Sequence, residues 1–213
     1  MALNIADIRK EYVLHSLGED NVLPNPFSQF QQWFSEAETA QVDEVNAMTL
    51  ATADATGAPS ARIVLLKGVD ENGFSFFTNY NSKKGHDLRV NPRAALVFFW
   101  RELERQVRVS GAVSKLPDAD SDAYFMSRPE GSKIGAWSSP QSEVIISREI
   151  LNTWVEEKEK LLKGKLISRP DFWGGYCLVP DKIEFWQGRA NRLHDRILYR
   201  RENENWKIER LAP

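Results

Sequence analysis

The chain has 213 residues, 42% of them hydrophobic and 27% charged, which is typical of a globular protein with a substantial core. Its formal net charge of −2 excludes a chain-wide electrostatic attraction to nucleic acid or to an anionic membrane, so any anion site must be a local cluster of cations. The single cysteine, Cys177, excludes an intrachain disulfide, and the longest apolar run, 94–100, is too short to cross a bilayer, so we expect a cytoplasmic protein.

The first 24 residues predict a short amphipathic helix over 4–14 and then a loop rich in Gly, Asp, Asn and Pro. On these residues alone two interpretations remain open, a lid over an active site and a frayed terminus. A clearer helix begins at Asn25-Pro26, which supply an N-cap and a first-turn proline. Its apolar stripe recurs at three- and four-residue steps and consists of Phe27, Phe30, Phe34 and Ala37.

Most of residues 47–115 are predicted to be β-strands joined by short turns. Short connections between successive strands indicate antiparallel pairing, and the lack of βαβ crossovers favours a barrel over a Rossmann sheet. A helix predicted over 82–90 interrupts the series. The predicted strands are 48–53, 61–67, 74–79, 94–100 and 105–113.

Polar side chains on these strands are candidate ligand contacts. Arg62 and Lys67 bracket the apolar run 63–66, which we predict to be a buried strand. The two cations either extend to the rim of the barrel or contact a phosphate at its mouth. Gln106 is an amide on a barrel strand, where such a group usually has a partner.

Two helix ends are candidate phosphate sites. The segment 78–85 joins a strand to a helix start and carries two consecutive lysines, so helix amides and ammonium groups can hold a phosphate there. It lacks the glycine spacing of a nucleotide-binding loop. At the end of a helix predicted over 117–128, Tyr124 and Arg128 lie one turn apart. An arginine at a helix C-terminus also has a purely dipolar explanation.

The remaining chain is predicted to contain one long amphipathic helix and several C-terminal strands. Residues 129–132 break the preceding helix, and 140–142 form a loop. Gly174 and Gly175 allow another segment to approach closely. The sequence shows no repeat or linker, so we expect one domain over 1–213. The helix is predicted over 147–163 and the strands over 176–179, 182–186, 192–200 and 206–211, the last two as a hairpin.

The stretch 185–196 holds the densest group of candidate ligand-binding residues. If it is extended from Arg192 onward, then Arg192, His194 and Arg196 point to one face. Two fixed cations and an imidazole suit an anion, and Trp186 beside them suits a flat ring. A solvated edge strand whose charges prevent aggregation is the alternative explanation.

Common catalytic and metal-binding motifs are absent from the sequence, including H-E-x-x-H, paired C-x-x-C, G-x-S-x-G, the Walker loop and G-x-G-x-x-G. The three histidines lie far apart in the chain, so we expect no metal site. A barrel with several cation clusters and 11% aromatic residues predicts one or two phosphorylated, planar ligands, without defining a reaction.

The pattern of Ile183–Gln187, four further residues and then Arg192–Arg196 resembles the C-terminal signature of the pyridoxine/pyridoxamine 5′-phosphate oxidases. The resemblance covers about 8–213, essentially the whole chain. It continues in RIVLLK at 62–67, SRP at 127–129, IGAW at 134–137, FWGG at 172–175 and the final residues 207–213.

This resemblance implies a mainly β protein with flanking helices, an antiparallel FMN-binding split β-barrel that works as a homodimer with FMN at the subunit interface. It implies oxidation of pyridoxine 5′-phosphate or pyridoxamine 5′-phosphate to pyridoxal 5′-phosphate, by hydride transfer from the substrate C4′ carbon to the flavin, with O2 as the acceptor that gives H2O2. A non-catalytic flavin or pyridoxal-phosphate binding protein on the same fold is the alternative, and a flavin reductase of another small molecule is a third. A second phosphate site favours the oxidase, because a flavin carrier does not need one.

The resemblance also implies roles for individual residues. Arg192 and His194 would be catalytic, closing over the pyridine ring on the side away from the flavin. The implied FMN-binding residues are Arg62, Ile63, Val64, Leu65, Leu66, Lys67, Phe77, Thr78, Lys83, Lys84, Gln106, Gln141, Ser142, Trp186 and Arg196. The implied substrate-binding residues are Arg9, Tyr12, Lys67, Tyr124, Arg128, Ser132, Arg192, Leu193 and His194, the first two in an N-terminal lid.

Two departures from the family pattern stand out. Lys83 occupies a position where the family has arginine, which keeps the charge and loses the bidentate fork. The segment after Tyr12 is acidic where members are often basic. The second departure puts in doubt lid contacts or a secondary product site that would use those residues.

Overall fold

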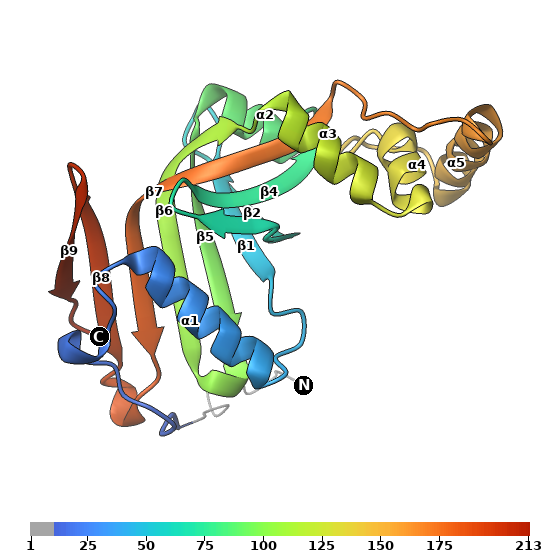
Figure 1. Cartoon of the computed structure of the whole chain (residues 1–213). Coiled ribbons are helices and arrows are strands. Elements are labelled where there is room, and N and C mark those ends of the chain that lie inside the picture. The colour runs from blue at the N-terminus through green and yellow to red at the C-terminus, as the bar shows by residue number, and fades with distance from the viewer. Residues whose placement is uncertain (1–10) are drawn as a thin grey trace, which may run out of the picture. The chain divides into compact units, whose positions relative to one another are not determined.

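The computed structural model describes residues 11–213, which form a mainly β protein with flanking helices (Figure 1). The sheet has the strand order β2-β1-β5-β6-β7-β4-β3, and β8 pairs with both β7 and β9. The strands are β1 Ala47–Ala53, β2 Pro59–Leu65, β3 Gly68–Asp70, β4 Gly73–Asn79, β5 Arg93–Trp100, β6 Arg105–Lys115, β7 Trp173–Gln187, β8 Asp195–Glu202 and β9 Asn205–Arg210. The helices are α1 Pro26–Thr39, α2 Lys83–Val90, α3 Asp118–Ser127, α4 Glu130–Ser138 and α5 Arg148–Leu162, with short 3-10 turns η2 Glu19–Asn21, η3 Arg101–Leu103 and η4 Ala190–Arg192.

The described chain divides into two compact units. Unit 1 comprises the described residues up to Met48 together with Leu96–Ser110 and Pro180–Pro213. Unit 2 comprises Thr49–Ala95 and Gly111–Val179. None of the helices within residues 11–213 is both long and apolar enough to span a membrane.

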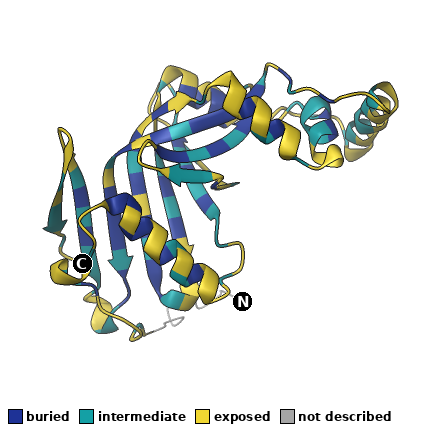
Figure 2. Cartoon of the chain, viewed as in Figure 1, coloured by how far each residue is buried: buried dark blue, intermediate teal, exposed yellow. Residues whose placement is uncertain are grey.

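In unit 1, helix α1 packs its predicted apolar stripe against aromatic residues of the sheet. Asn25 caps the helix by accepting hydrogen bonds from the amides of residues 27 and 28, as its sequence position predicts. Phe30 lies 5.0 Å from Phe98 between ring centroids, and Trp33 lies 5.2 Å from Phe185. These contacts confirm the predicted amphipathic helix. Figure 2 shows the buried residues alternating along the strands, as expected for strands with one covered face.

In unit 2, helices α3 and α4 and the segment before β7 share a core of Phe125, Ile134, Ile167 and Trp173. The paired glycines lie where β7 pairs with β4. A Cβ atom on Gly174 would lie 2.1 Å from the Tyr80 hydroxyl, and one on Gly175 would lie 2.5 Å from a methyl group of Leu116. The expected close approach at these glycines is confirmed.

Strand β7 is continuous, whereas the sequence predicted two strands separated by Pro180. Its residues up to Leu178 pair with β4, and its residues from Lys182 onward pair with β8. Pro180 lies between these two pairings and has no amide to donate, so the change of partner strand falls at a residue that cannot complete a ladder. The prediction of a break was wrong because β7 exchanges β4 for β8 at this point without ending.

Helix α4 begins where the sequence predicted only a break. Pro129 ends α3, and its carbonyl oxygen then accepts hydrogen bonds from the amides of Ser132 and Lys133, at 3.0 and 3.1 Å. A proline can precede a helix as readily as it ends one, because the missing amide is not needed at the first turn. The other predicted helices and strands are confirmed within a few residues, except at 4–14 and 192–194.

The predicted helix over 4–14 is wrong where it can be compared, because residues 11–14 are not helical. The amides of Val13 and Leu14 donate to the carboxylate of Glu104, at 2.9 and 3.2 Å. These amides are therefore committed to a residue about ninety positions away instead of to a helical carbonyl. Residues 4–10, including Arg9, lie outside the described residues.

Candidate functional site

A cavity of about 830 Å³ lies in unit 2, a volume within the range of small-molecule sites. Its walls come from β2, β4, the start of β7, α2, α3, α4 and the loop that follows α4. The cavity brings together fourteen residues predicted from the sequence: Arg62, Ile63, Val64, Leu65, Lys67, Phe77, Thr78, Lys83, Lys84, Tyr124, Arg128, Ser132, Gln141 and Ser142.

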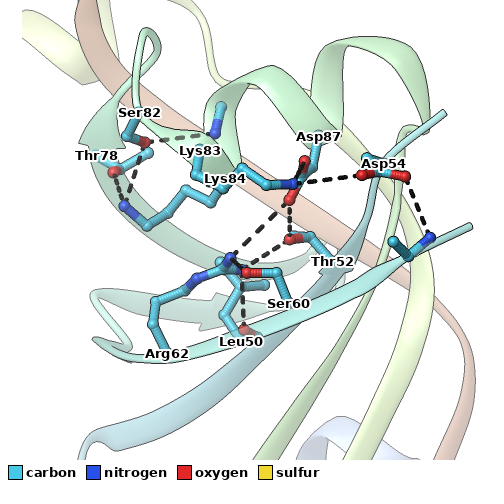
Figure 3. A network of polar contacts seen from close by, with 12 residues as sticks. Leu50, Thr52, Asp54, Ser60, Arg62, Thr78, Ser82, Lys83, Lys84 and Asp87 are labelled. Carbon is cyan, nitrogen blue, oxygen red and sulfur yellow. Dashed lines mark hydrogen bonds and ion pairs between the residues drawn. The ribbon is translucent and has the colours of Figure 1, made fainter. Parts of the chain in front are cut away.

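At one end of the cavity, Arg62 is held in place by neutral acceptors. Its Nη1 donates to the Leu50 carbonyl oxygen at 3.2 Å and to Thr52 Oγ1 at 2.8 Å, and its Nη2 donates to Ser60 Oγ at 2.6 Å (Figure 3). The nearest carboxylate oxygen, Asp87 Oδ2, lies 4.0 Å from Nη2. The guanidinium is thus fixed in orientation and only loosely neutralised, which suits an anion receptor.

Lys83 and Asp87 complete this end. Lys83 Nζ lies 2.5 Å from Asp87 Oδ1 and 3.8 Å from Asp54 Oδ2 (Figure 3). Asp87 is buried, and the pKa of its carboxyl stays below the ordinary value because hydrogen bonds from Lys83 and Thr52 outweigh the opposing effect of burial. Lys83 therefore reaches the same group of side chains as Arg62, although it lacks the arginine fork expected at this position.

Lys84 is the buried ammonium group of the cluster. Its Nζ donates to Thr78 Oγ1 at 3.0 Å, to Ser82 Oγ at 3.2 Å and to Gln141 Oε1 at 3.1 Å, all neutral oxygens. Burial, together with the nearby charge of Arg62, lowers the pKa of Lys84 to about 8. Among the described residues, Arg62, Lys83 and Lys84 face the carboxylates of Asp87 and Asp54, so the cluster has an excess of positive charge that an anion would neutralise.

The low pKa of Lys84 predicts a pH dependence of anion binding. A bound anion favours the charged ammonium and raises its pKa, so affinity is fully present below pH 8 and is lost as the pH rises above it. We expect the dissociation constant for sulfate, which does not titrate in this range, to rise by up to about tenfold per pH unit above pH 8. Calorimetric titration from pH 6.5 to 9.5 measures this, and Lys84→Met is expected to remove the dependence. A flat profile in the parent would contradict the prediction.

Elsewhere on the cavity wall, two further cations lie over stacked aromatic rings. Phe77 and Tyr124 stack with ring centroids 3.9 Å apart, and Trp173 stacks on Phe77 at 5.6 Å. The guanidinium carbon of Arg128 lies 4.7 Å from the Trp173 ring centroid, and Lys67 Nζ lies 5.9 Å from that of Tyr124. Two separate cationic centres with an aromatic wall can bind two anionic groups and a flat ring.

Arg128 Nη1 is buried and has no hydrogen-bond partner within the described chain. Burial also lowers the pKa of Arg128, because it disfavours the charged form. A buried unsatisfied donor is costly, and a ligand oxygen is the usual explanation for one in a cavity. Arg128 is therefore a strong candidate for an anion contact.

Strand β2 contributes to the cavity differently from the prediction. The run 63–66 was expected to be buried, but Ile63 is 64% exposed and Leu65 is 40% exposed. Arg62 and Val64 are the less exposed positions of an alternating edge strand. Leu66, which follows the strand, is buried and does not line the cavity. The sequence did not reveal this alternation in exposure, because the apolar run places aliphatic residues on both faces of the strand.

A second group of predicted residues lies in unit 1. The rings of Trp186 and His194 are 4.6 Å apart between centroids, and Tyr12 lies 5.7 Å from Trp186 and 5.9 Å from His194. The Arg189 amide donates to His194 Nδ1 at 3.1 Å, so the neutral imidazole carries its proton on Nε2. Burial and the charge of Arg192 lower the pKa of His194, which favours this neutral form.

The prediction that Arg192, His194 and Arg196 share one strand face is wrong. Asn191 and Arg192 have φ values of 56° and 62° within η4, and β8 begins only at Asp195. Arg196 Nε donates to Glu184 Oε1 at 2.8 Å. The chain therefore turns at Arg192, and period-two alternation does not apply there.

The remaining predicted residues are placed as follows. Gln106 lies on β6 in unit 1 and is partly exposed. Leu193 follows η4 and is 67% exposed. Between residues 11 and 213, no cluster of three or more His, Cys, Asp or Glu side chains is arranged to hold a metal ion.

Three residues that the sequence did not single out shape the unit 2 cavity. Asp87 and Thr52 orient the cations, and Trp173 belongs to the aromatic wall and lies against the Arg128 guanidinium. Lys83 and Asp87 lie four residues apart on a helix, and this spacing could have identified Asp87 from the sequence. Thr52 had no local signal, because its contacts to Arg62 and Asp87 depend on the sheet.

Comparison with known families assigns most of the chain. Residues 34–160 match the family model described as "Pyridoxamine 5'-phosphate oxidase". Residues 173–213, which hold β7 to β9, match the one described as "Pyridoxine 5'-phosphate oxidase C-terminal dimerisation region". The second match supports a homodimer.

Similar proteins agree with this assignment. A pyridoxine/pyridoxamine 5'-phosphate oxidase of Nostoc sp. is 56% identical over the full length of both chains. One of Paraburkholderia phymatum is 58% identical over 98% of this chain and 99% of its own.

Solved structures confirm the predicted split-barrel fold. PhzG from Burkholderia lata, in complex with tetrahydrophenazine-1-carboxylic acid, has a TM-score of 0.86 at 31% identity and covers 91% of this chain and 95% of its own. A pyridoxamine 5'-phosphate oxidase-related, FMN-binding protein from Nostoc punctiforme has a TM-score of 0.70 at 17% identity, over 89% of this chain and 98% of its own. The chain therefore belongs to the pyridoxamine 5'-phosphate oxidase family of oxidoreductases.

Proposed function

We propose that the protein is an FMN-dependent oxidase that converts pyridoxine 5'-phosphate or pyridoxamine 5'-phosphate to pyridoxal 5'-phosphate, with O2 as electron acceptor. The observation that carries the proposal is the pair of cationic centres in the unit 2 cavity, which provides for two anionic groups beside an aromatic wall. One centre would hold the phosphate of FMN and the other the phosphate of the substrate. We further propose a homodimer with FMN at the subunit interface, in accord with the match to a dimerisation region. The cytoplasmic location and the single domain stay predictions.

The residues of the first centre fit the phosphate of FMN. Lys84 is desolvated and donates to three neutral oxygens, and Arg62 is pre-oriented by Leu50, Thr52 and Ser60. A phosphate would supply the negative charge that this cluster lacks. Bound FMN would supply the acceptor for the hydride that leaves the substrate C4′ carbon.

The other residues would bind and orient the substrate. Its phosphate would be held by Arg128, Lys67, Tyr124 and Ser132. The Nη1 atom of Arg128, which has no hydrogen-bond partner among residues 11–213, supports this. Arg192 and His194 would lie over the pyridine ring, and the neutral imidazole of His194 can donate a hydrogen bond from Nε2 to a ring substituent. Holding the ring in one orientation raises the rate of hydride transfer through proximity.

Oxidation of another substrate is the alternative, because PhzG shares the fold and its structure holds a tetrahydrophenazine carboxylic acid. Visible absorption of the purified protein tests the proposal. We expect flavin bands that bleach when pyridoxine 5'-phosphate is added without oxygen and recover in air, with pyridoxal 5'-phosphate and H2O2 formed. Flavin bands that do not bleach would refute the oxidase and leave a flavin carrier or an enzyme for another substrate. A colourless protein that takes up no FMN would refute flavin binding.

Replacing Arg128 by methionine is expected to raise KM for pyridoxine 5'-phosphate by about 100-fold, because a charge-assisted hydrogen bond to phosphate is lost while packing on Trp173 is kept. FMN affinity is expected to stay at the parental value. Steady-state kinetics and FMN titration measure the two effects. Arg148→Met, at an exposed position on α5 outside the cavity, is the matched control. Equal KM values in the two variants would remove Arg128 from the substrate site.

A further inference from the structure

The N-terminal segment that carries Tyr12 is fastened to unit 1 by carboxylates. Glu104 Oε2 accepts the amide hydrogens of Val13 at 2.9 Å and Leu14 at 3.2 Å. Farther along, Asp195 Oδ2 accepts the amide of Leu17 at 3.0 Å. The backbone just after Tyr12 is therefore fixed by directed, charge-assisted hydrogen bonds.

Arg210 binds the other end of this segment. Its Nη2 donates to the Leu17 carbonyl oxygen at 3.2 Å, and its guanidinium binds both carboxylate oxygens of Glu19, at 2.8 and 2.6 Å. Arg210 Nη1 also donates to Asp195 Oδ1 at 2.9 Å. Glu19 thus contributes to the attachment of this segment, and residues 13–19 form a strap with fixed ends.

Glu104 also holds the segment that leads to His194. Its backbone carbonyl oxygen accepts the Gly188 amide at 2.8 Å and the side-chain amide of Gln187 at 3.2 Å. One residue therefore binds the strap through its carboxylate and the Trp186–His194 segment through its backbone. Gly188 completes the fit, because a Cβ atom there would lie 2.6 Å from Cγ of Tyr12.

The backbone of Glu104 supports a specific need for its side chain. Its φ and ψ are 55° and 38°, the left-handed region that glycine adopts without strain and that other residues rarely occupy. The residue is also buried, with 2% of its surface exposed, which is unusual for a glutamate. A buried carboxylate at a position that favours glycine is explained if the hydrogen bonds of that carboxylate have a function.

We propose that Glu104 is a positioning residue that sets Tyr12 against His194 and thereby sets the affinity for the substrate ring. The proposal rests on the proposed oxidase function. Glu104 touches neither reacting atoms nor the flavin in this account. The Glu104 side chain acts only through the strap, so its removal should raise KM only in a protein that has Tyr12.

A double-mutant cycle with Glu104→Gly and Tyr12→Ala tests this. Glycine keeps the left-handed backbone and removes the whole side chain, including the carboxylate, so we expect E104G to fold and to bind FMN with parental affinity. We expect KM for pyridoxine 5'-phosphate to rise about tenfold in E104G and by less than about twofold when E104G is added to Y12A. E104Q keeps an acceptor oxygen and should recover most of the loss, and E102Q, on the exposed neighbouring turn, should match the parent.

Hydrogen exchange at Val13 and Leu14 gives a readout that does not depend on activity. Both amides should be protected in the parent and in E102Q, and should lose protection in E104G. An unchanged KM in E104G, or an equal rise in the presence and absence of Tyr12, would overturn the positioning role. If the parent does not oxidise pyridoxine 5'-phosphate, the proposed function fails by itself. In that case, unchanged exchange at Val13 and Leu14 in E104G would also refute the attachment of the strap by Glu104, whereas lost protection would support that attachment.

Discussion

Replacing Arg62 by alanine is expected to weaken FMN binding by at least about 100-fold, equivalent to about 3 kcal/mol. Three neutral oxygens, from Leu50, Thr52 and Ser60, already fix the guanidinium, so no ordering cost remains when a phosphate binds. The substitution also removes a guanidinium that can donate two parallel hydrogen bonds to one phosphate. Asp87 would then keep Lys83 as its ion-pair partner among the described residues and would repel the incoming phosphate.

Equilibrium titration of the apoprotein with FMN, followed by flavin fluorescence, measures this effect. Arg62→Lys keeps the charge and loses the fork, so its affinity is expected to lie between those of the parent and of Arg62→Ala. Thermal unfolding of both variants shows whether a loss of binding follows from a loss of fold. Parental affinity in a folded Arg62→Ala protein would show that Arg62 is not the phosphate ligand.

Replacing Gly85 by alanine is expected to lower the free energy of unfolding by about 3 kcal/mol. A Cβ atom there would lie 2.1 Å from the Tyr80 carbonyl oxygen and 2.5 Å from its carbonyl carbon, so the clash is with backbone and no rotamer relieves it. Gly85 lies in the first turn of α2, directly after Lys84. A shift of this turn would also displace the lysines, and we expect weaker FMN binding in the same variant.

The matched control is Gly131→Ala in α4, where a new Cβ atom would meet nothing within 4 Å. Alanine favours a helix over glycine by up to about 1 kcal/mol, so this variant should equal or exceed the parent in stability. Urea unfolding followed by tryptophan fluorescence compares the three proteins. A Gly85→Ala protein as stable as the Gly131→Ala protein would mean that α2 can move away without cost.

Local sequence signals determined much of the secondary structure. Asn25 and Pro26 defined the start of α1, and the turn after Glu202 defined the β8–β9 hairpin, because caps and tight turns depend on residues a few positions apart. The FWQ and RLHDR motifs indicated the family from residue identity alone. Fourteen of the residues that the family resemblance named line one cavity, and their roles stay predictions.

Where contacts join distant parts of the chain, the tertiary structure determined the local backbone conformation. The carboxylate of Glu104 takes the amides of Val13 and Leu14, and so prevents the helix that their local pattern predicts. The left-handed backbone at Asn191 and Arg192 ends the alternation expected for a strand. Neither feature has a signal within a short window of sequence, because a local pattern does not contain the partner.

The electrostatic character of the site also came from the tertiary structure. The sequence provides Arg62, Lys83 and Lys84 as cations, yet only the fold gives Lys84 neutral partners and a pKa of about 8. The fold likewise leaves Arg128 Nη1 buried without a partner within the described residues. The sequence therefore determined which charges and rings are present, and the tertiary structure determined which of them are desolvated, because burial and charge balance depend on residues brought together from separate elements.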